Sequence, residues 1–401
     1  MAVWDDLVGQ ERVREQLAAA ARDADALVTA GSTGADVPEG SRMTHAWLFT
    51  GPPGSGRATA ARAFAAALQC VSPDRALGAA PGCGFCDGCH TALTGTHADV
   101  TVVATEGLTL GVKQTRELVR GASLSPAVGR WQVIVVEDAD RFTEQAANAV
   151  LKAVEEPAPR TVWLLCAPSL EDVLPTIRSR CRHLTLRTPP VDAVADILIR
   201  RDGIDPQLAH DSARATQGHI GRARRLATDP AARDRRSAVL RMPLRVADLG
   251  GCLKAAQELV DAAAAEAKQV AEEVDEKETE ELRAAMGGGP GGRMPRGTAG
   301  VMKELEKRQK SRLTRTQRDS LDLALTDLAG FYRDVLALQF GSQVAIANVA
   351  MGDALDRVAR ESSAEQTLRR IEAIGECRDA LDRNVAPLLA VEAMAVALRA
   401  G

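Results

Sequence analysis

A glycine-rich loop between a predicted strand and a predicted helix constrains the fold of this chain more than any other feature. Residues 51–58 read Gly-Pro-Pro-Gly-Ser-Gly-Arg-Ala, and the glycines are Gly51, Gly54 and Gly56. The apolar residues 45–50 predict a buried strand before the loop. The alanine-rich residues 60–68 predict a helix after it, because alanine and leucine favour helices. A phosphate-binding loop needs this order of elements, since loop amides and the helix N-terminus must face the phosphates.

The two loop positions that would carry chemistry are changed. In the pattern G-x-x-x-x-G-K-[ST], the lysine reaches the β- and γ-phosphates and the hydroxyl holds Mg²⁺. Arg57 stands in place of that lysine, and Ala58 in place of the hydroxyl residue. Thr59 follows, but one helical residue is about 100° of rotation, so its hydroxyl should point elsewhere. The loop therefore predicts a nucleotide-binding architecture without the equipment for turnover. The alternative is a strand, loop and helix that happen to be glycine-rich.

A second candidate for nucleotide chemistry follows a continuous apolar run. Residues 131–136 predict a buried parallel strand, and Glu137 and Asp138 come directly after it. Open α/β sheets bind ligands at the carboxyl ends of their strands. A working ATPase uses such carboxylates to hold Mg²⁺ and activate water, but here the order is Glu-Asp instead of Asp-Glu. We interpret the pair as a degenerate acidic motif; the alternative is two acidic residues that simply end a strand.

Four cysteines form the strongest metal signal in the sequence. Three have the spacing C-x-x-C-x-x-C, and the fourth ends the helix predicted before them. They are Cys70, Cys83, Cys86 and Cys89. Four thiolates complete a closed tetrahedral Zn²⁺ site, so we expect a structural zinc ion rather than a catalytic one. His90 or His97 could replace one thiolate, and a chance cluster of thiols is the remaining alternative.

Composition argues against several classes of protein. The 401 residues carry a net charge of −4, with 26% charged and only 3% aromatic residues, which argues against a uniformly basic nucleic-acid coat. No run of about 18 apolar residues predicts a membrane span, and no signal-peptide pattern is visible. The eight cysteines then suggest a reducing compartment. We expect a cytoplasmic protein without a membrane partner.

Strands alternate with helices over residues 45–187, which predicts a parallel sheet with helices on both faces. The later part of the chain reads as helical. We expect three domains: an α/β domain over residues 1–188 with a cysteine module at about 70–90, a small helical lid over 189–245, and an all-α collar over 246–401.

The third domain carries a charged, glycine-rich insert at about residues 265–315. Residues 261–283 are mainly acidic, residues 303–318 are mainly basic, and a Gly-Pro linker lies between them at 287–292. The two arms could pair as a helical hairpin. Runs of charge are usually solvated, however, so we expect partial disorder over 261–318.

Taken in order, these motifs resemble the bacterial clamp-loader AAA+ family. The likeness extends to about residue 225 and rests on the cysteine insertion and four further motifs: Val8-Gly9-Gln10, residues 45–49, residues 147–157 and Ser179-Arg180-Cys181. The resemblance implies an AAA+ fold, that is, a P-loop NTPase-like sheet, a helical lid and a collar that holds subunits together. ATP-hydrolysing members would keep Lys and Thr at positions 57 and 58, so the resemblance implies a subunit without turnover.

The resemblance also implies a role for Arg180. In this family the arginine of a Ser-Arg-Cys motif, here Ser179-Arg180-Cys181, reaches across a subunit boundary onto a neighbour's ATP. A planar guanidinium can stabilise charge on the γ-phosphate. Without the motif, an arginine at a helix end is more often a surface or capping residue. The family's sensing arginine would fall at Gly221, one place before Arg222, so we expect this sensor to be absent.

Three functions are open at this point. The first is a non-hydrolysing subunit of the DNA polymerase III clamp loader, a DNA-directed DNA polymerase (nucleotidyltransferase) assembly. Its implied partners are tau/gamma and delta subunits in a hetero-pentamer, the sliding clamp, and primed DNA. The second is an active tau/gamma-like ATPase, against which Arg57 and Ala58 argue. The third is a zinc-dependent nucleic-acid binder, against which the acidic charge and low aromatic content argue. Whether the loop still binds ATP stays open.

Overall fold

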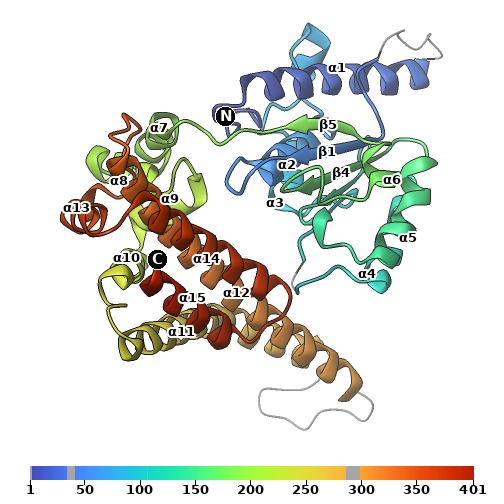
Figure 1. Ribbon diagram of the computed structural model, residues 1–401. Coiled ribbons are helices and arrows are strands. Elements are labelled where there is room, and N and C mark those ends of the chain that lie inside the picture. The colour runs from blue at the N-terminus through green and yellow to red at the C-terminus, as the bar shows by residue number, and fades with distance from the viewer. Residues whose placement is uncertain (1, 34–40, 106, 286–298) are drawn as a thin grey trace. The chain divides into compact units, whose positions relative to one another are not determined.

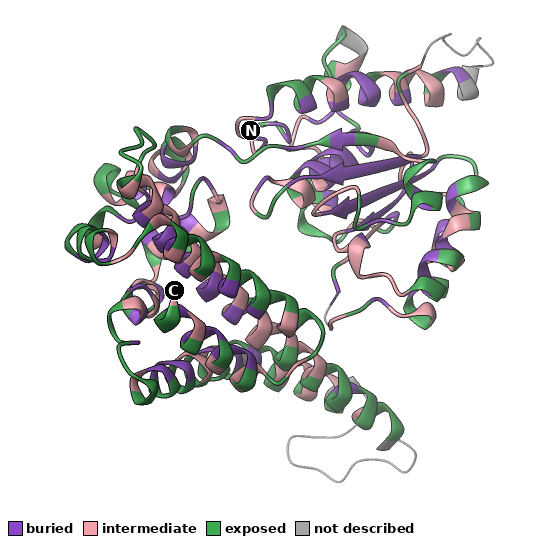
Figure 2. Cartoon of the chain, in the orientation of Figure 1, coloured by how far each residue is buried: buried purple, intermediate pink, exposed green. Residues whose placement is uncertain are grey.

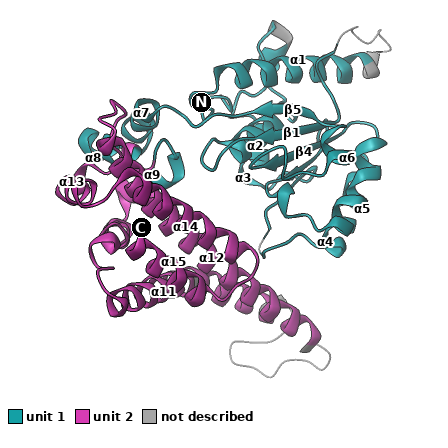
Figure 3. Cartoon of the chain, viewed as in Figure 1, with its two compact units in different colours: residues 1–213, 217–224 teal, residues 214–216, 225–401 magenta. Residues whose placement is uncertain are grey.

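The computed structural model describes residues 2–33, 41–105, 107–285 and 299–401. They form two units, which are described separately. Unit 1 comprises residues 1–213 and 217–224, and unit 2 comprises residues 214–216 and 225–401 (Figure 3). Helices and strands carry the labels of Figure 1.

Unit 1 is built around a five-stranded parallel sheet. Its strands are β1 (Ala46–Thr50), β2 (Val100–Val103), β3 (Gln132–Val136), β4 (Thr161–Ala167) and β5 (Arg182–Thr185). They lie in the order β2-β3-β4-β1-β5, with Leu48 of β1 opposite Leu165 of β4. Every residue of β1, β3 and β4 is buried (Figure 2). Because parallel strands covered on both faces read as continuous apolar runs, this arrangement confirms the predicted parallel sheet.

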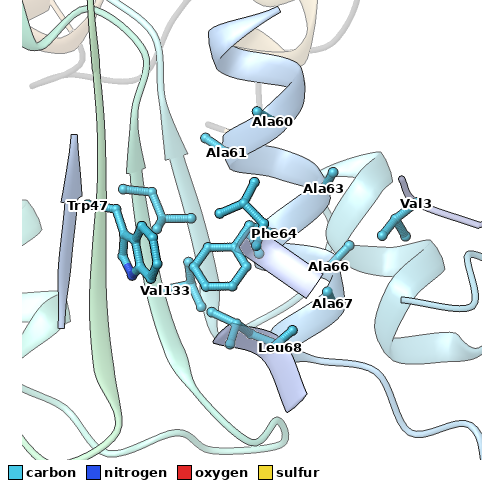
Figure 4. Packing of buried hydrophobic residues seen from close by; sticks show 14 of the residues in the cluster. Val3, Trp47, Ala60, Ala61, Ala63, Phe64, Ala66, Ala67, Leu68 and Val133 are labelled. Carbon is cyan, nitrogen blue, oxygen red and sulfur yellow. The ribbon is translucent and has the colours of Figure 1, made fainter. Parts of the chain in front are cut away.

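Helices cover both faces of this sheet. One face packs against α1 (Glu11–Thr33), α2 (Arg57–Leu68) and α3 (Asp87–Thr94), the other against α4 (Val112–Ala122), α5 (Glu144–Glu155) and α6 (Pro175–Arg178). Alternate residues of β1 enter the two apolar clusters, Trp47 on the α2 side and Leu48 on the α5 side. Figure 4 shows Phe64 of α2 beside Trp47; their rings meet edge to face with centroids 5.1 Å apart. This packing fixes the helix that follows the glycine-rich loop.

Short helices complete the region beyond the sheet. They are α7 (Val191–Asp202), α8 (Pro206–Ala215) and α9 (Ile220–Thr228), and two 3₁₀ turns lie earlier, η1 (Pro73–Leu77) and η2 (Ala139–Arg141). Within unit 1, small side chains such as Ala209 and Ala223 pack with Leu198 in a separate core. Small residues allow these helices to approach closely.

The described residues of unit 2 form helices and no strands, as predicted for the end of the chain. Its elements are α10 (Pro230–Leu240), η3 (Met242–Leu244), α11 (Leu249–Ala285), α12 (Ala299–Gln339), η4 (Val349–Met351), α13 (Gly352–Glu361), α14 (Ala364–Asp382) and α15 (Pro387–Ala400). Leu325 and Phe331 of α12 pack with Met394 of α15 in its core. Although α11 and α12 are long, no helix among the described residues is both long and apolar enough to cross a membrane.

The prediction of partial disorder over 261–318 is wrong for the described residues. They lie in α11 and α12, which form the paired hairpin that was the other alternative. Arg312 pairs with Glu278 at 2.7 Å and with Asp275 at 3.5 Å, and Ala267 and Leu305 are buried. The opposite charges of the two arms neutralise each other, and small apolar residues provide a shared interface. The linker at 287–292 lies outside the described residues.

Candidate functional site

The glycine-rich loop connects β1 to α2, as predicted. The Gly51 N–H donates to Pro168 O and the Ser55 N–H to Pro52 O, each at 3.1 Å. Gly54 and Gly56 have left-handed backbones with φ of 86° and 89°, a conformation that glycine adopts without steric cost. Because α2 begins directly after Gly56, its first amides lie at the end of the loop. The backbone frame of a phosphate loop is therefore present.

Arg57 is bonded to its own loop. Its Nη1 donates to the Gly51 carbonyl at 2.8 Å. Thr59 is exposed on α2 and Ala60 is buried, in agreement with the rotation expected along the helix. The cation at the lysine position is thus engaged by loop backbone, and Ala58 offers no hydroxyl for Mg²⁺.

His219, which the sequence analysis did not single out, packs against the loop. A Cβ built on Gly54 would lie only 2.5 Å from Cγ of His219, so the ring occupies the space beside this glycine. Burial lowers the pKa of His219 to about 4, and the nearby charges of Arg222 and Arg57 act in the same direction. The imidazole is therefore neutral at pH 7. No local pattern marks His219, because it reaches the loop from a segment far along the chain.

Gln10 ties the N-terminal motif to the loop. Its side chain is buried, and Nε2 donates to the Ser55 carbonyl at 3.2 Å and to the carbonyl of Arg187. Its Oε1 accepts from the Arg187 N–H at 3.3 Å. The Val8-Gly9-Gln10 motif therefore supports the loop and the segment that leaves β5.

The carboxylates after β3 are bonded within the protein. Glu137 Oε1 lies 2.6 Å from Nε of Arg62, which belongs to α2. Asp138 accepts a hydrogen bond from the Thr105 N–H at 3.0 Å. Burial raises the pKa of Asp140, and the charge of Asp138 adds to this effect. The structure thus brings Glu137 close to the loop's helix, but as the partner of an arginine.

The four predicted cysteines come together where α2 ends. The Sγ atoms lie within 4.8 Å of one another. Cys70 Sγ is 3.9 Å from the sulfurs of Cys83 and Cys86, and Cys83 Sγ is 4.0 Å from that of Cys89. A tetrahedral site with Zn–S bonds of about 2.3 Å has sulfur–sulfur edges of about 3.8 Å. The cluster could therefore hold one metal ion, and its ligand set within the described residues includes neither His90 nor His97.

Hydrogen bonds and a close backbone contact prepare this cluster. The thiol of Cys89 donates to Ala66 O at 3.4 Å. The neighbouring Cys89 and backbone amides lower the pKa of Cys70, whereas Cys70 and burial raise the pKa of Cys89. The Cys86 N–H donates to the sulfur of Cys83 at 3.4 Å. A Cβ on Gly88 would lie 2.0 Å from Gln69 O, so glycine lets α3 approach the end of α2. One sulfur is already suited to be a thiolate ligand.

Arg180 lies in the turn after α6, on the other side of the sheet from α2. Its Nη1 donates to Thr176 O at 2.7 Å and to Ser179 Oγ at 3.1 Å. Its Nη2 lies 2.6 Å from Glu155 Oε1, and 39% of its side chain is exposed. Burial raises the pKa of Cys181 to about 12, so this thiol is neutral and packs with the apolar cluster behind the turn. The Ser-Arg-Cys motif thus places one exposed guanidinium on an anchored turn.

Comparisons with known proteins found similarity mainly in the first half of the chain, including residues 37–190. These residues match the family model described as DNA polymerase III, delta subunit. The DNA polymerase III subunit delta' of Pseudomonas aeruginosa is 34% identical over 180 residues, which are 44% of this chain and 54% of the relative. The subunit delta' of Escherichia coli K12 is 36% identical over 154 residues, 38% of this chain and 45% of the relative.

A subunit of another name is also similar. The DNA polymerase III subunit gamma/tau of Mycobacterium tuberculosis H37Rv is 32% identical over 200 residues, 50% of this chain and 31% of the relative. This chain therefore spans only between 31% and 54% of the lengths of these relatives. Over that region, the chain is similar to subunits of DNA polymerase III that are named delta' and gamma/tau.

Proposed function

We propose that this chain is a delta-prime-like clamp-loader subunit that does not hydrolyse ATP and supplies Arg180 to the ATP site of a neighbouring subunit. A contrast between two arginines carries the proposal. Arg57 lies at the loop and donates to the loop's own carbonyl, whereas Arg180 lies on the surface with 39% of its side chain exposed. Both side chains bond within the chain, but Arg57 is partly buried at the loop, whereas Arg180 is exposed and accessible to another molecule.

The mechanism follows from guanidinium chemistry. ATP held by a neighbour's phosphate loop would lie against the surface that carries Arg180. In the transition state, charge spreads over the γ-phosphate oxygens, and a planar guanidinium can donate hydrogen bonds to them. An arginine supplied in this way contributes about 10³–10⁵-fold in related phosphoryl transfers. Hydrolysis would therefore depend on assembly.

The proposed partners are those of a clamp loader. Tau/gamma and delta subunits would form a hetero-pentamer with this chain, and the assembled complex would contact the sliding clamp and primed DNA. Hydrolysis would be used to open and place the clamp at a primer–template junction. Residues 246–401 would serve as the collar that holds the subunits together, and residues 189–245 as the lid.

We propose a structural Zn²⁺ ion for the cysteine cluster. The four thiolates would fill a tetrahedral shell, and a full shell has no position for substrate. Cys70 follows α2, whereas Cys89 lies within α3. The ion would therefore hold the end of the loop's helix to α3.

An active tau/gamma-like ATPase is the second candidate. The similarity to the gamma/tau subunit of Mycobacterium tuberculosis favours it, and Arg57 keeps a positive charge at the lysine position. Ala58, the pairing of Glu137 with Arg62 and the position of His219 beside Gly54 argue against it. We therefore prefer the non-hydrolysing subunit.

A reconstituted complex tests the proposal. In this complex only the subunit that faces Arg180 retains a working phosphate loop, and phosphate release is measured with primed DNA. We expect Arg180→Ala to lower turnover by at least about 10³-fold. The exposed neighbour Arg178→Ala is the matched control and should leave turnover within about twofold of the wild-type value.

Two results would contradict the proposal. Unchanged turnover with Arg180→Ala would exclude the trans role of this residue. Robust turnover by the isolated chain would show that Arg57 works in place of lysine, and the ATPase would then be the better description. The same preparations answer both questions.

A further inference from the structure

We infer that Glu155 is a positioning residue that holds the Arg180 guanidinium in the orientation in which it meets a neighbour's nucleotide. The inference rests on the proposed function, because it concerns how Arg180 acts in trans. It adds a residue that touches neither ATP nor the neighbouring subunit in the proposed mechanism.

The hydrogen bonds of Arg180 show how its side chain is held. A guanidinium has five N–H groups. Nη1 uses two of them, on Thr176 O at 2.7 Å and on Ser179 Oγ at 3.1 Å. Nη2 forms an ion pair with Glu155 Oε1 at 2.6 Å. Among the described residues the Nε and Nη2 N–H groups donate no hydrogen bond, so an oriented guanidinium keeps donors for a ligand.

The apolar cluster on this face of the sheet holds the backbone near both Glu155 and Arg180. Glu155 is the last residue of α5, Thr176 lies within the single turn of α6, and Arg180 follows that turn. Val154 and Ile177 are both buried in the apolar cluster on this face of the sheet. The backbone positions of Glu155 and Arg180 are therefore fixed relative to each other, so their contact does not depend on a mobile segment.

The location of Glu155 is electrostatically unfavourable without Arg180. The C-terminal end of a helix carries partial negative charge from unpaired carbonyls, which disfavours a carboxylate there. Glu155 occupies this end of α5, and Arg180 offsets the repulsion. The adjacent Glu156 is also exposed but has no ion pair among the described residues, which makes it a matched control.

An exposed ion pair contributes little to overall stability, so we attribute the value of this pair to orientation. A long arginine side chain loses rotamer freedom when it is ordered in a transition state. If Glu155 restricts those rotamers beforehand, less freedom is lost when ATP reacts. The rate of hydrolysis, rather than the affinity for ATP, should then depend on Glu155.

The experiment uses full-length chain in the reconstituted complex with a single working ATP site. The kcat and KM for ATP are measured for Glu155→Gln, Glu155→Asp and Glu156→Gln, each with Arg180 and with Arg180→Ala. We expect Glu155→Gln to lower kcat about three- to tenfold. This loss is larger than removal of an exposed ion pair would cause and smaller than displacement of a catalytic group would cause. KM should change less than twofold. Glu155→Asp should retain more turnover than Glu155→Gln, and Glu156→Gln should match the wild type.

The double variant separates positioning from a general effect. In the Arg180→Ala background, Glu155→Gln should cause no further loss, because a positioning residue acts only through the group that it positions. Thermal unfolding of each variant checks that the fold is retained. A loss from Glu155→Gln that persists without Arg180 would overturn the inference.

The remaining outcomes distinguish this inference from the proposed function. If Arg180→Ala abolishes turnover but Glu155→Gln has wild-type or higher kcat, Glu155 does not position Arg180, and the proposed function stands. If Arg180→Ala leaves turnover unchanged, the proposed function fails, and the inference about Glu155 fails with it.

Discussion

The glycine-rich loop region and the Arg180 region satisfy their charged side chains in different ways. At the loop, Arg57 donates to the Gly51 carbonyl, and Glu137 pairs with Arg62. At the other face of the sheet, Arg180 donates two hydrogen bonds within the chain, forms an ion pair with Glu155 and lies on the surface. The two regions belong to the same unit and share the same sheet.

The loop region and the Arg180 region would therefore offer a nucleotide different contacts. A phosphate entering the loop region would compete with the hydrogen bond of Arg57 and would meet a loop against which His219 packs. Near Arg180, a ligand from another subunit would meet donors that are already oriented, and preorganised donors need no rearrangement during reaction. Four measurements, with successively smaller expected effects, test whether the two regions differ in this way.

Removal of a metal ion from the cysteine cluster should have the largest effect. Structural zinc contributes roughly 10 kcal/mol of apparent binding free energy in zinc-finger peptides. Chelation, or Cys89→Ser, should therefore expose the amides of α2 and α3 to hydrogen exchange, while those near Arg180 stay protected. Amide exchange measured by mass spectrometry checks this expectation.

The control for the metal prediction lies outside the cluster. Cys377 is buried in unit 2, so Cys377→Ala should keep one metal equivalent per chain, as measured with a chromogenic chelator. Purified wild-type chain that releases no metal on denaturation would contradict the proposed zinc site. Equal loss of protection near α2 and near Arg180 would show that the two regions are not independent.

The stability contributed by His219 should depend on pH. Its pKa is about 4 in the folded protein and about 6.5 when unfolded. The unfolded chain therefore binds the proton more readily. The contribution of His219 to the free energy of unfolding is fully present above pH 6.5 and is lost as the pH falls toward 4. Between pH 7 and 4.5, this loss amounts to about 2–3 kcal/mol of unfolding free energy.

Urea unfolding of wild type and His219→Gln at several pH values measures that contribution as a difference. The two free energies of unfolding should converge or cross as the pH falls, because other titrating groups are common to both proteins. A pH profile of His219→Gln that runs parallel to that of the wild type would mean that the ring beside Gly54 is solvated.

Restoring the loop residues should not by itself restore ATP binding. Arg57→Lys with Ala58→Thr supplies the missing amine and hydroxyl, yet His219 still lies against Gly54. Adding His219→Ala should raise the affinity for MgATP at least tenfold, or about 1.4 kcal/mol. Isothermal titration calorimetry compares the two variants. Micromolar binding by the first variant alone would show that His219 does not obstruct the loop.

The Arg62–Glu137 pair should have the smallest effect. Its side chains are 39% and 17% exposed, and such pairs contribute less than about 1 kcal/mol to stability. Arg62→Ala should therefore cost little unfolding free energy and leave turnover of the complex within twofold of wild type. A double-mutant cycle with Glu137→Gln measures the coupling. A large fall in turnover would show that the loop region takes part in hydrolysis.

Patterns between near neighbours predicted much of the architecture. The apolar runs at β1 and β3 predicted the buried parallel sheet, and the spacing of Cys83, Cys86 and Cys89 predicted the cluster that the structure brings together. The Ser-Arg-Cys motif drew attention to Arg180. Its proposed role remains to be tested by turnover.

Other features could not be predicted from local patterns. The expectation of partial disorder is wrong for the described residues of 261–318, because Arg312 pairs with Asp275 and Glu278 across the hairpin that was the other alternative. The opposite signs of the two runs were the available signal. For His219 beside Gly54, no comparable signal exists in the sequence.

The sequence by itself determined the alternation of strands and helices, the loop between β1 and α2, and the set of four thiols. Only the tertiary structure decided that Arg57 bonds to its own loop, that His219 lies on Gly54 and that Glu155 meets Arg180. Helix and strand propensities depend on neighbours along the chain. The contacts of His219 and Glu155, in contrast, join residues brought together by the strand order β2-β3-β4-β1-β5 and by side-chain packing, and local periodicity does not encode either.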